Sequence, residues 1–253
     1  MRLIRLCSGG KTGWASLDDD GLYWLEGDPF GQWAPGTEVV GLVGASCLTP
    51  CTPTKIVAVG LNYLSHAEEV AASVPREPLF FLKPPSAVLA HEESIVYPAT
   101  LSTRVDYEGE LAVVIGRRTK GVSPDGALKH VLGYTCANDV TARDLQRRDG
   151  QWTRAKGFDT FCPIGPIIST DADPTDLTIC TRLNGEVRQR SSTREMIFPV
   201  EELISHVSAV MTLEAGDVIL TGTPAGVGEL RPGDRVEVEI AGIGTLANTV
   251  VRG

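Results

Sequence analysis

Turn-forming residues constrain the fold of this chain more than any other feature of its sequence. Its 253 residues include 27 glycines and 16 prolines, and both residue types favour turns and interrupt helices. Long helices are therefore excluded over most of the chain, and short strands must supply much of the core. The sequence predicts an α+β fold that is rich in strands and poor in helices.

The N-terminal part of the chain is predicted to form a small β-rich domain. Its expected elements are strands at residues 2–7, 13–17 and 22–25, an aspartate-rich turn at 18–21 and a short helix at 39–43. The segment 48–53 follows, and its two prolines disfavour both a helix and a central strand. We therefore place a domain boundary there, with a small domain at 1–52 and a larger one at 53–253.

The larger domain is predicted to combine many strands with few helices. Residues 199–211 carry apolar side chains at helical spacing, whereas residues 235–240 alternate apolar and charged side chains. The expected helices are 63–73, 141–148 and 199–211. The expected strands are 56–59, 79–82, 104–116, 132–137, 178–183, 218–221, 235–240 and 244–251.

The charge balance excludes several classes of partner. The chain has 23 basic and 32 acidic residues, which gives a net charge of −9 and a pI near 5.0. Nucleic acid and anionic membranes both require a basic surface, so neither is expected as a partner. No apolar run approaches the roughly 20 residues of a membrane helix, and the N-terminus becomes polar too early for a signal peptide. We expect a cytoplasmic protein.

The cysteines predict no covalent framework. The six cysteines are dispersed and form no CxxC pair, which argues against a disulfide scaffold and a structural zinc site. They are expected to be buried thiols, and they are Cys7, Cys47, Cys51, Cys136, Cys162 and Cys180.

Three acidic residues alternate along the predicted strand 104–116. Asp106, Glu108 and Glu110 share parity, so the pleat directs all three to the same face of the sheet. Ala112 and Val114 continue that face into apolar surroundings, which disfavours open water. Either the strand presents an exposed acidic edge, or a hard divalent cation such as Mg²⁺ relieves the repulsion among the carboxylates.

A second set of polar residues surrounds a predicted strand-to-helix junction. Asp139 precedes the helix at 141–148, and its position by itself predicts a helix N-cap rather than a metal ligand. Arg143 and Gln146 lie three residues apart and therefore on adjacent positions of one helix face. An arginine there suits capture of a substrate carboxylate, although a solvated side chain is the simpler interpretation.

His66 and Glu69 are three residues apart in the predicted helix 63–73 and can therefore meet. Such a pair is either an ordinary surface contact or a dyad in which the carboxylate orients the imidazole for proton transfer. Lys83 and Lys156 end apolar segments and are suited to stabilising negative charge. The glycine-rich segment 222–228 lacks the Gly-Lys-Ser/Thr ending of a phosphate loop and predicts a turn whose backbone approaches a ligand.

Several motifs in a fixed order resemble the fumarylacetoacetate hydrolase family. The motifs are Gly-Leu-Asn-Tyr with His66 and Glu69, FFLKPPSA, DYEGELAVVIG, GYTCANDVTARDLQ, AKGFDTFCPIGP and DVILTGTPAGVG. They span residues 55–253, and their shared order is far more specific than any single motif. The resemblance implies a mixed β-roll with few helices. Segment 59–65 lacks the additional aspartate of the founding long-chain hydrolase, so the chain looks like the shorter bacterial branch.

The resemblance also implies roles for individual residues. It implies that the ligands of Mg²⁺ or Mn²⁺ are Glu108, Glu110 and Asp139. For Asp139, this role replaces the helix cap that its position alone predicts. It implies a catalytic group consisting of a water-activating dyad on a lid and two polar residues, namely His66, Glu69, Lys156 and Gln146. It implies substrate-binding positions at Arg143, Lys83 and Thr223. It further implies a homodimer that takes a small-molecule 2-oxo acid.

The expected chemistry proceeds through a metal-chelated enolate of a 2-oxo acid. Hydrolysis of an acylpyruvate-type C–C bond and isomerisation of a 2-hydroxydienedioate in aromatic catabolism both fit. Oxaloacetate decarboxylation uses the same enolate and is an alternative. Two hypotheses of a different kind are a non-catalytic metal-binding module on the same fold and a hydrolase that uses Cys136 or Cys162 as nucleophile.

Overall fold

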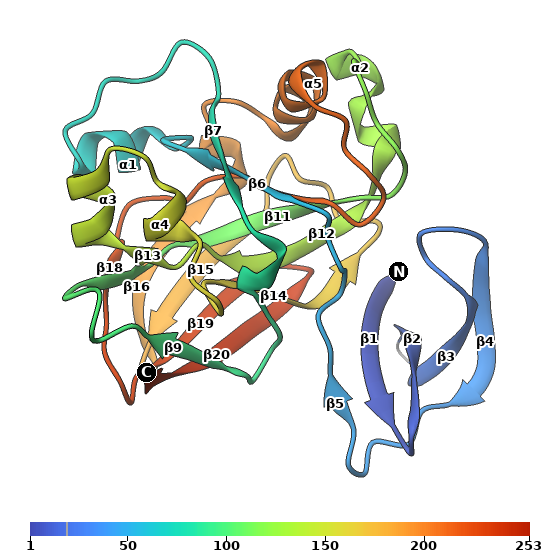
Figure 1. The fold of residues 1–253 in the computed structure, drawn as a ribbon. Coiled ribbons are helices and arrows are strands. Elements are labelled where there is room, and N and C mark those ends of the chain that lie inside the picture. The colour runs from blue at the N-terminus through green and yellow to red at the C-terminus, as the bar shows by residue number, and fades with distance from the viewer. Residues whose placement is uncertain (19) are drawn as a thin grey trace.

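The protein is a β-rich α+β structure, as the sequence predicted. The computed structural model describes residues 1–18 and 20–253, so part of the turn predicted at 18–21 lies outside the described residues. In Figure 1, the N-terminal strands lie to one side of the larger unit, and the helices lie along the top of that unit and on its far side. None of the described helices is long and apolar enough to cross a membrane.

A twelve-stranded sheet is the largest of the three sheets. Its main path runs β4-β3-β2-β1-β14-β12-β11-β17-β6-β7, while β5 pairs with β1 and β8 pairs with β14. The strands are β1 (Arg2–Ser8), β2 (Lys11–Leu17), β3 (Leu22–Gly27), β4 (Trp33–Val39), β5 (Ser46–Cys47), β6 (Ile56–Gly60), β7 (Leu79–Lys83), β8 (Val88–Leu89), β11 (Gly109–Ile115), β12 (Val131–Asn138), β14 (Cys162–Ser169) and β17 (Val218–Leu220). Because β1 pairs with β14, the proposed N-terminal domain extends this sheet.

Two smaller sheets and several short helices complete the fold (Figure 1). One sheet contains β10 (Val105–Tyr107), β13 (Thr141–Ala142) and β18 (Gly228–Leu230). The other contains β9 (Ser94–Tyr97), β15 (Thr178–Leu183), β16 (Glu186–Ser192), β19 (Arg235–Ile240) and β20 (Gly244–Arg252). The α-helices are α1 (Leu64–Glu69), α2 (Pro124–Ala127), α3 (Arg143–Asp149), α4 (Thr153–Lys156) and α5 (Val200–Val210). Short 3₁₀ turns occupy Pro85–Ala87, Leu128–His130 and Thr193–Glu195.

Strand β11 is buried on both faces. Leu111 and Val113 pack in one apolar cluster with α5, β19 and β20. Ala112 and Val114 pack on the other face, against residues of β14 and β17. The uninterrupted apolar run of this strand follows from that double burial. A polar side chain at the end of β11 therefore enters a site that packed strands already surround.

The strand predicted at 104–116 is divided in two at Glu108. β10 ends at Tyr107 and joins the three-stranded sheet, whereas β11 begins at Gly109 and joins the large sheet. Asp106, Glu108 and Glu110 still point to the same side despite this break, since all three line one cavity. The break thus lets one short segment of chain supply carboxylates where two sheets meet.

The expected helix at 39–43 is wrong. Val39 ends strand β4, and the Val40 N–H donates to the carbonyl of Leu22 in β3. The segment combines three β-branched valines with glycine and is too short to nucleate a helix against this strand pairing.

Two other predicted helices exist but are shorter than expected. The helix predicted at 63–73 ends at Glu69, and Ala71 adopts a left-handed backbone conformation with φ 52° that stops it. The helix predicted at 141–148 begins only at Arg143, because Thr141 and Ala142 pair with β10 instead. Tertiary strand pairing overrides local helical preference at this second site.

Asp217 joins the segment that follows the proposed domain boundary to the large sheet. Its carboxylate accepts hydrogen bonds from the backbone N–H groups of Thr54 (2.9 Å), Lys55 (3.1 Å) and Glu214 (2.7 Å). The Thr54 hydroxyl (2.7 Å) and the Lys55 ammonium also donate to it. Burial acts to raise the pKa of Asp217, but these donors outweigh burial and hold the pKa below its ordinary value of 3.8.

Replacing Asp217 with Asn should lower the free energy of unfolding by about 2–4 kcal/mol at pH 7, because an amide accepts fewer of these hydrogen bonds. A carboxylate whose pKa is lower in the folded protein than in the unfolded chain stabilises the folded protein fully at pH values above its unfolded-state pKa. This stabilisation is lost as the pH falls through the folded-state pKa. Urea unfolding at pH 7 and at pH 3 measures both effects. The difference in free energy of unfolding between the wild type and Asp217→Asn should be smaller at pH 3 than at pH 7.

The exposed Asp159 offers a matched control. Asp159→Asn should unfold like the wild type at both pH values. An Asp217→Asn protein as stable as the wild type at pH 7 would contradict the anchoring role.

Candidate active site

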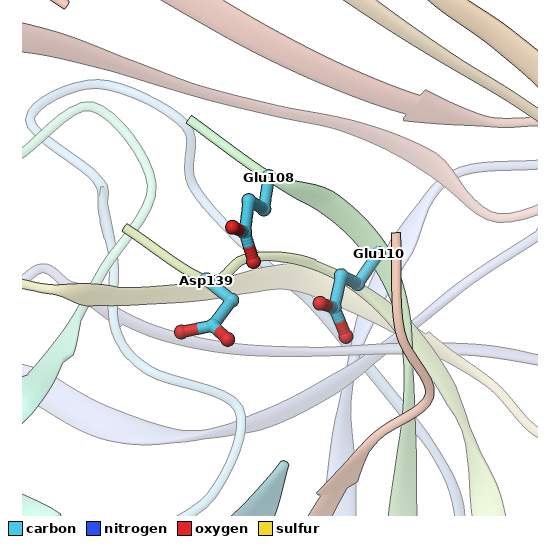
Figure 2. Close-up of side chains that lie close together, drawn as sticks. All are labelled: Glu108, Glu110 and Asp139. Atoms are coloured by element: carbon cyan, nitrogen blue, oxygen red, sulfur yellow. The ribbon is translucent and has the colours of Figure 1, made fainter. Parts of the chain in front are cut away.

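Three buried carboxylates converge at one end of β11. Glu108 lies at the break between β10 and β11, Glu110 lies within β11, and Asp139 directly follows β12. One oxygen of each lies within 4.8 Å of one oxygen of each of the others. Figure 2 shows the three side chains directed toward a common point. The structure therefore brings the three residues into one group, and their burial excludes an exposed acidic edge.

Hydrogen bonds from backbone N–H groups fix the positions of these three residues relative to one another. The Asp139 N–H donates to the Glu108 carbonyl (2.8 Å), and the Glu108 N–H donates to Oδ1 of Asn138 (2.9 Å). The Gly222 N–H donates to Oε2 of Glu110 (2.7 Å). Asp139 does not cap α3, because Ala142 occupies the N-cap position. The isolated capping expectation for Asp139 is therefore wrong, since strand β13 intervenes before the helix begins.

Two buried lysines compensate part of this negative charge. Lys156 Nζ contacts Oε2 of Glu108 (2.8 Å) and Oδ2 of Asp139 (2.6 Å). Lys83 Nζ contacts Oδ1 of Asp139 and the carbonyl of Val140. Lys83, expected to contact substrate, is buried against Asp139 and is not among the residues that line the cavity. Its position is that of a fixed counter-charge for a carboxylate.

The electrostatics differ sharply among the three carboxylates. Burial would raise the pKa of Glu108, but Lys156 and Arg143 outweigh burial and hold that pKa below its ordinary value. Glu110 has no cation within 4.0 Å among the described residues, and burial together with Asp139 and Glu108 raises its pKa well above the ordinary value. The site therefore lacks positive charge at Glu110.

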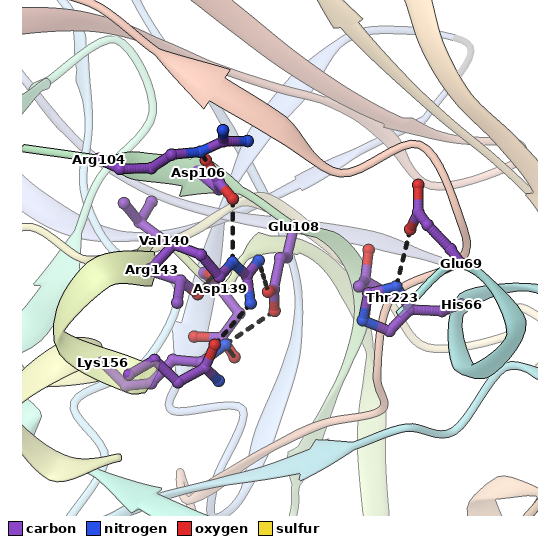
Figure 3. Close-up of polar contacts among 12 residues, drawn as sticks. His66, Glu69, Arg104, Asp106, Glu108, Asp139, Val140, Arg143, Lys156 and Thr223 are labelled. Atoms are coloured by element: carbon purple, nitrogen blue, oxygen red, sulfur yellow. Dashed lines mark hydrogen bonds and ion pairs between the residues drawn. The ribbon is translucent and has the colours of Figure 1, made fainter. Parts of the chain in front are cut away.

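Arg143 bridges the acidic group to the neighbouring sheet, as Figure 3 shows. Its Nε donates to Oδ2 of Asp106 (2.9 Å), and another nitrogen contacts Oε1 of Glu108. A third nitrogen donates to Oε1 of Gln146 (2.7 Å), which confirms the predicted adjacency of these two side chains. Arg104 Nε donates to the other oxygen of Asp106 (2.9 Å). Two arginines thus share one carboxylate.

His66 and Glu69 form a dyad on α1. His66 Nδ1 lies 3.0 Å from Oε2 of Glu69, and the other carboxylate oxygen accepts from the Gly226 N–H (2.9 Å). The glycine-rich segment 222–228 therefore contacts both the dyad and Glu110. Within it, the Thr223 hydroxyl donates to the Gly109 carbonyl (2.9 Å) between the two glutamates. Backbone N–H groups of this segment thus reach both Glu110 and Glu69.

One cavity of about 700 Å³ lies among these groups. Every candidate residue except Lys83 lines it, namely His66, Glu69, Glu108, Glu110, Asp139, Arg143, Gln146, Lys156 and Thr223. Sequence reasoning missed the cavity-lining residues Phe81, Arg104, Arg147 and Trp152. Arg147 could have been found from its position one helix turn after Arg143. The aromatic residues carried no signal, because their approach to the site depends on tertiary packing.

Gln189 is another residue that the sequence did not single out. Its Oε1 accepts from the Gly109 N–H (2.9 Å), and its Nε2 donates to the Thr223 hydroxyl and the Pro224 carbonyl (both 2.8 Å). One side chain from β16 therefore joins the backbone between the glutamates to the glycine-rich segment. Such a link is visible only in three dimensions.

Family models match nearly the whole chain. The model described as "Fumarylacetoacetate (FAA) hydrolase C-terminal" matches residues 55–251, and the model described as "Rv2993c-like, N-terminal" matches residues 1–50. The chain belongs to the fumarylacetoacetate hydrolase family. The family resemblance and the expected fold are confirmed.

Relatives with named activities are similar over most of their length. The structure titled 5-carboxymethyl-2-hydroxymuconate delta-isomerase from Mycobacterium smegmatis has a TM-score of 0.93 and 46% identity, with 100% of both chains covered. The 2-hydroxyhepta-2,4-diene-1,7-dioate isomerase from Mycobacterium marinum has a TM-score of 0.90 and 46% identity, covering 100% of this chain and 98% of that one. The mitochondrial oxaloacetate tautomerase FAHD2A of Bos taurus is 48% identical, covering 81% of this chain and 69% of that protein.

Gly109 tests how tightly the site is packed. A Cβ at this position would lie 2.0 Å from Oγ1 of Thr181 and 3.1 Å from Oε1 of Gln189. Gly109→Ala should therefore lower the free energy of unfolding by about 1–3 kcal/mol, because the buried neighbours must move. Urea denaturation measures the change.

Gly126→Ala is the matched control. In α2 the nearest atom to its added methyl would be Oγ of Ser123 at 3.8 Å, and alanine favours helix. This variant should be neutral or up to about 1 kcal/mol more stable. Equal effects at the two glycines would refute the close packing around Gly109.

Proposed function

We propose that this protein is a divalent-metal-dependent enzyme that acts on 2-oxo acids of the 1,3-diketo or hydroxymuconate type. Its reaction is either hydrolysis of an acylpyruvate-type C–C bond or isomerisation of a 2-hydroxydienedioate in aromatic catabolism. The carrying observation is the convergence of three buried carboxylates with a buried lysine and a His–Glu dyad in one cavity. A buried acidic group of this kind is costly without a cation.

The donor set fits a hard divalent cation. Glu108, Glu110 and Asp139 offer only oxygen ligands, which Mg²⁺ and Mn²⁺ prefer. Their oxygens retain lone pairs beyond those used by the lysines, and Glu110 has the least compensated charge. A bound cation would act as a Lewis acid that orients a 2-oxo acid and withdraws electron density from it.

Lys156 is placed to stabilise negative charge on the substrate. Its ammonium is nearly inaccessible and lies at the cavity wall between Glu108 and Asp139. Burial would lower the pKa of Lys156, but Asp139 and Glu108 outweigh burial and raise it, so the group stays cationic. A fixed cation in a buried site needs no reorganisation as charge develops on a substrate oxygen. Gln146, held by Arg143, adds a polar group at the same wall.

The dyad supplies proton transfer. Glu69 bonds Nδ1 of His66 and thereby leaves Nε2 as the ring nitrogen available to accept a proton. His66 lines the cavity, so this nitrogen can take a proton from water or from a substrate carbon. Attack by the activated water gives hydrolysis, whereas return of the proton at another position gives isomerisation.

Isomerase and tautomerase names among the relatives support proton transfer, and one related structure is named as a fumarylacetoacetate hydrolase. Two related structures carry isomerase names, and one relative is named as an oxaloacetate tautomerase. Keto–enol tautomerisation of oxaloacetate is therefore a second candidate reaction that the same dyad supports. Assays with Mg²⁺ or Mn²⁺ against acylpyruvates, oxaloacetate and a hydroxymuconate diacid separate these reactions, and oxaloacetate decarboxylation, by their products.

A non-catalytic module and a cysteine-dependent hydrolase both find less support. A non-catalytic metal-binding module would not require the dyad to face the carboxylates across one cavity. A cysteine nucleophile is disfavoured because burial raises the pKa of both the Cys136 and the Cys162 thiols to about 12.

We further propose a homodimer located in the cytoplasm, as the family resemblance and the sequence predict. Size-exclusion chromatography with light scattering tests the dimer, and cell fractionation tests the location.

Glu110→Gln tests the cation site. The neutral amide is a weaker ligand, so affinity for Mn²⁺ should fall by more than about tenfold and turnover should disappear. Without metal, the variant should unfold at the same or a higher temperature, because one of three like charges is removed. Mn²⁺ binding and thermal unfolding measure the two effects. The exposed Glu186 provides a control, since Glu186→Gln should retain both properties.

His66→Ala tests the division of labour in the cavity. Loss of the base should lower hydrolysis of an acylpyruvate by about 10²–10⁴-fold, while oxaloacetate decarboxylation, which needs no water activation, should persist. Steady-state kinetics with both substrates measure the difference. His206→Ala, outside the cavity beside Phe80, should retain both activities. Equal losses of the two activities in His66→Ala would contradict the proposed role.

A further inference from the structure

Three arginines contribute to the lining of the cavity. They are Arg104, just before β10, and Arg143 and Arg147 on α3. Arg104 and Arg143 bond opposite oxygens of the Asp106 carboxylate, and Arg147 follows Arg143 by one helix turn. The three arginines all line this cavity and are here called the arginine wall.

The arginine wall carries more positive charge than its acidic partners neutralise. Asp106 is shared by Arg104 and Arg143, and Glu108 is shared by Arg143 and Lys156. Arg147 has no carboxylate within 4.0 Å among residues 1–18 and 20–253, and its side chain donates no hydrogen bond to that part of the chain. An exposed cationic side chain without a partner thus lines the same cavity as the carboxylate group.

The next residue shows that this arrangement is specific to one side of α3. Arg148 lies beside Arg147 in sequence but does not line the cavity. Its Nε contacts Oδ1 of Asp149 at 3.5 Å. Two consecutive arginines of one helix therefore differ in their surroundings. Arg147 is unpaired and lines the cavity, whereas Arg148 contacts Asp149 and does not line it.

We propose that Arg147, assisted by Arg104, binds the second carboxylate of a dicarboxylic 2-oxo acid and thereby sets substrate specificity. This inference rests on the proposed function, in which the first carboxylate and the 2-oxo group lie at Glu108, Glu110 and Asp139. The cavity of about 700 Å³ exceeds what a three-carbon acid needs. A guanidinium matches a carboxylate in shape and charge.

The apolar side chains of the cavity fit the carbon chain of such a diacid. Phe81 and Trp152 line the cavity and pack edge to face with ring centroids 5.1 Å apart. The Lys156 ammonium lies 5.2 Å from the centre of the Phe81 ring. The cavity thus offers oxygen ligands, an apolar surface and an unpaired guanidinium, which together match the two charged ends and the apolar middle of a diacid.

Binding to Mn²⁺-loaded protein tests the proposal. Isothermal titration calorimetry would compare 2-oxopentanedioate, a diacid, with 2-oxobutanoate, a monoacid that offers the same chelating group. The wild type should bind the diacid more tightly. Arg147→Gln should weaken diacid binding by about tenfold and change monoacid binding by less than about twofold, since one charge-assisted contact is lost. Arg147→Lys should recover part of the diacid affinity by keeping the charge.

Arg148→Gln is the matched control and should bind both ligands like the wild type. Equal affinity of the wild type for the two acids, or equal weakening of both in Arg147→Gln, would overturn the specificity role and leave the proposed function intact. Failure of the Mn²⁺-loaded wild type to bind either acid would overturn the proposed function itself, and the specificity role with it. The urea unfolding midpoint of each variant shows that a lost affinity does not come from unfolding.

Discussion

The site depends on holding three like charges together in a buried place. Glu108, Glu110 and Asp139 are buried and would repel one another, because buried charges are only weakly screened. Lys83 and Lys156 compensate two of the carboxylates, and the Gly222 N–H supports the third. This compensation is incomplete at Glu110, which is the physical reason for proposing a divalent cation there. The structure thus maintains a preformed negative site by placing its counter-charges on separate elements.

The geometry of the sheets makes this arrangement possible. The break at Glu108 sends β10 and β11 into different sheets, so the carboxylates lie where the sheets separate. β11 packs between two apolar clusters, and a one-residue shift of its register would turn Glu110 away from the cavity toward apolar side chains. The rigid strand therefore carries Glu110, while the His66–Glu69 dyad belongs to a short helix tethered through Gly226. The buried carboxylates and the dyad thus belong to separate elements that meet at one cavity.

Much of the fold and of the site could be predicted from local patterns. Alternation in residues 104–116 placed Asp106, Glu108 and Glu110 on one face, and helical spacing paired His66 with Glu69 and Arg143 with Gln146. The errors arose where distant pairing overrode local preference. Val39 joined β4 instead of a helix, and strand β13 separated Asp139 from the helix it was expected to cap. The convergence of Asp139 with the two glutamates came from the family resemblance, because no local spacing connects them.

The sequence by itself determined which residues could carry chemistry, since parity and helical spacing are properties of neighbouring residues. It also determined the β-rich class, because glycine and proline exclude long helices over most of the chain. Only the tertiary structure decided that Lys83 supports Asp139 instead of lining the cavity, that Gln189 joins Gly109 to Thr223, and that Arg147 stays unpaired where Arg148 does not. The first two outcomes depend on contacts between segments far apart in the chain, and the third depends on where α3 lies against the cavity, so no local spacing in the sequence predicts them.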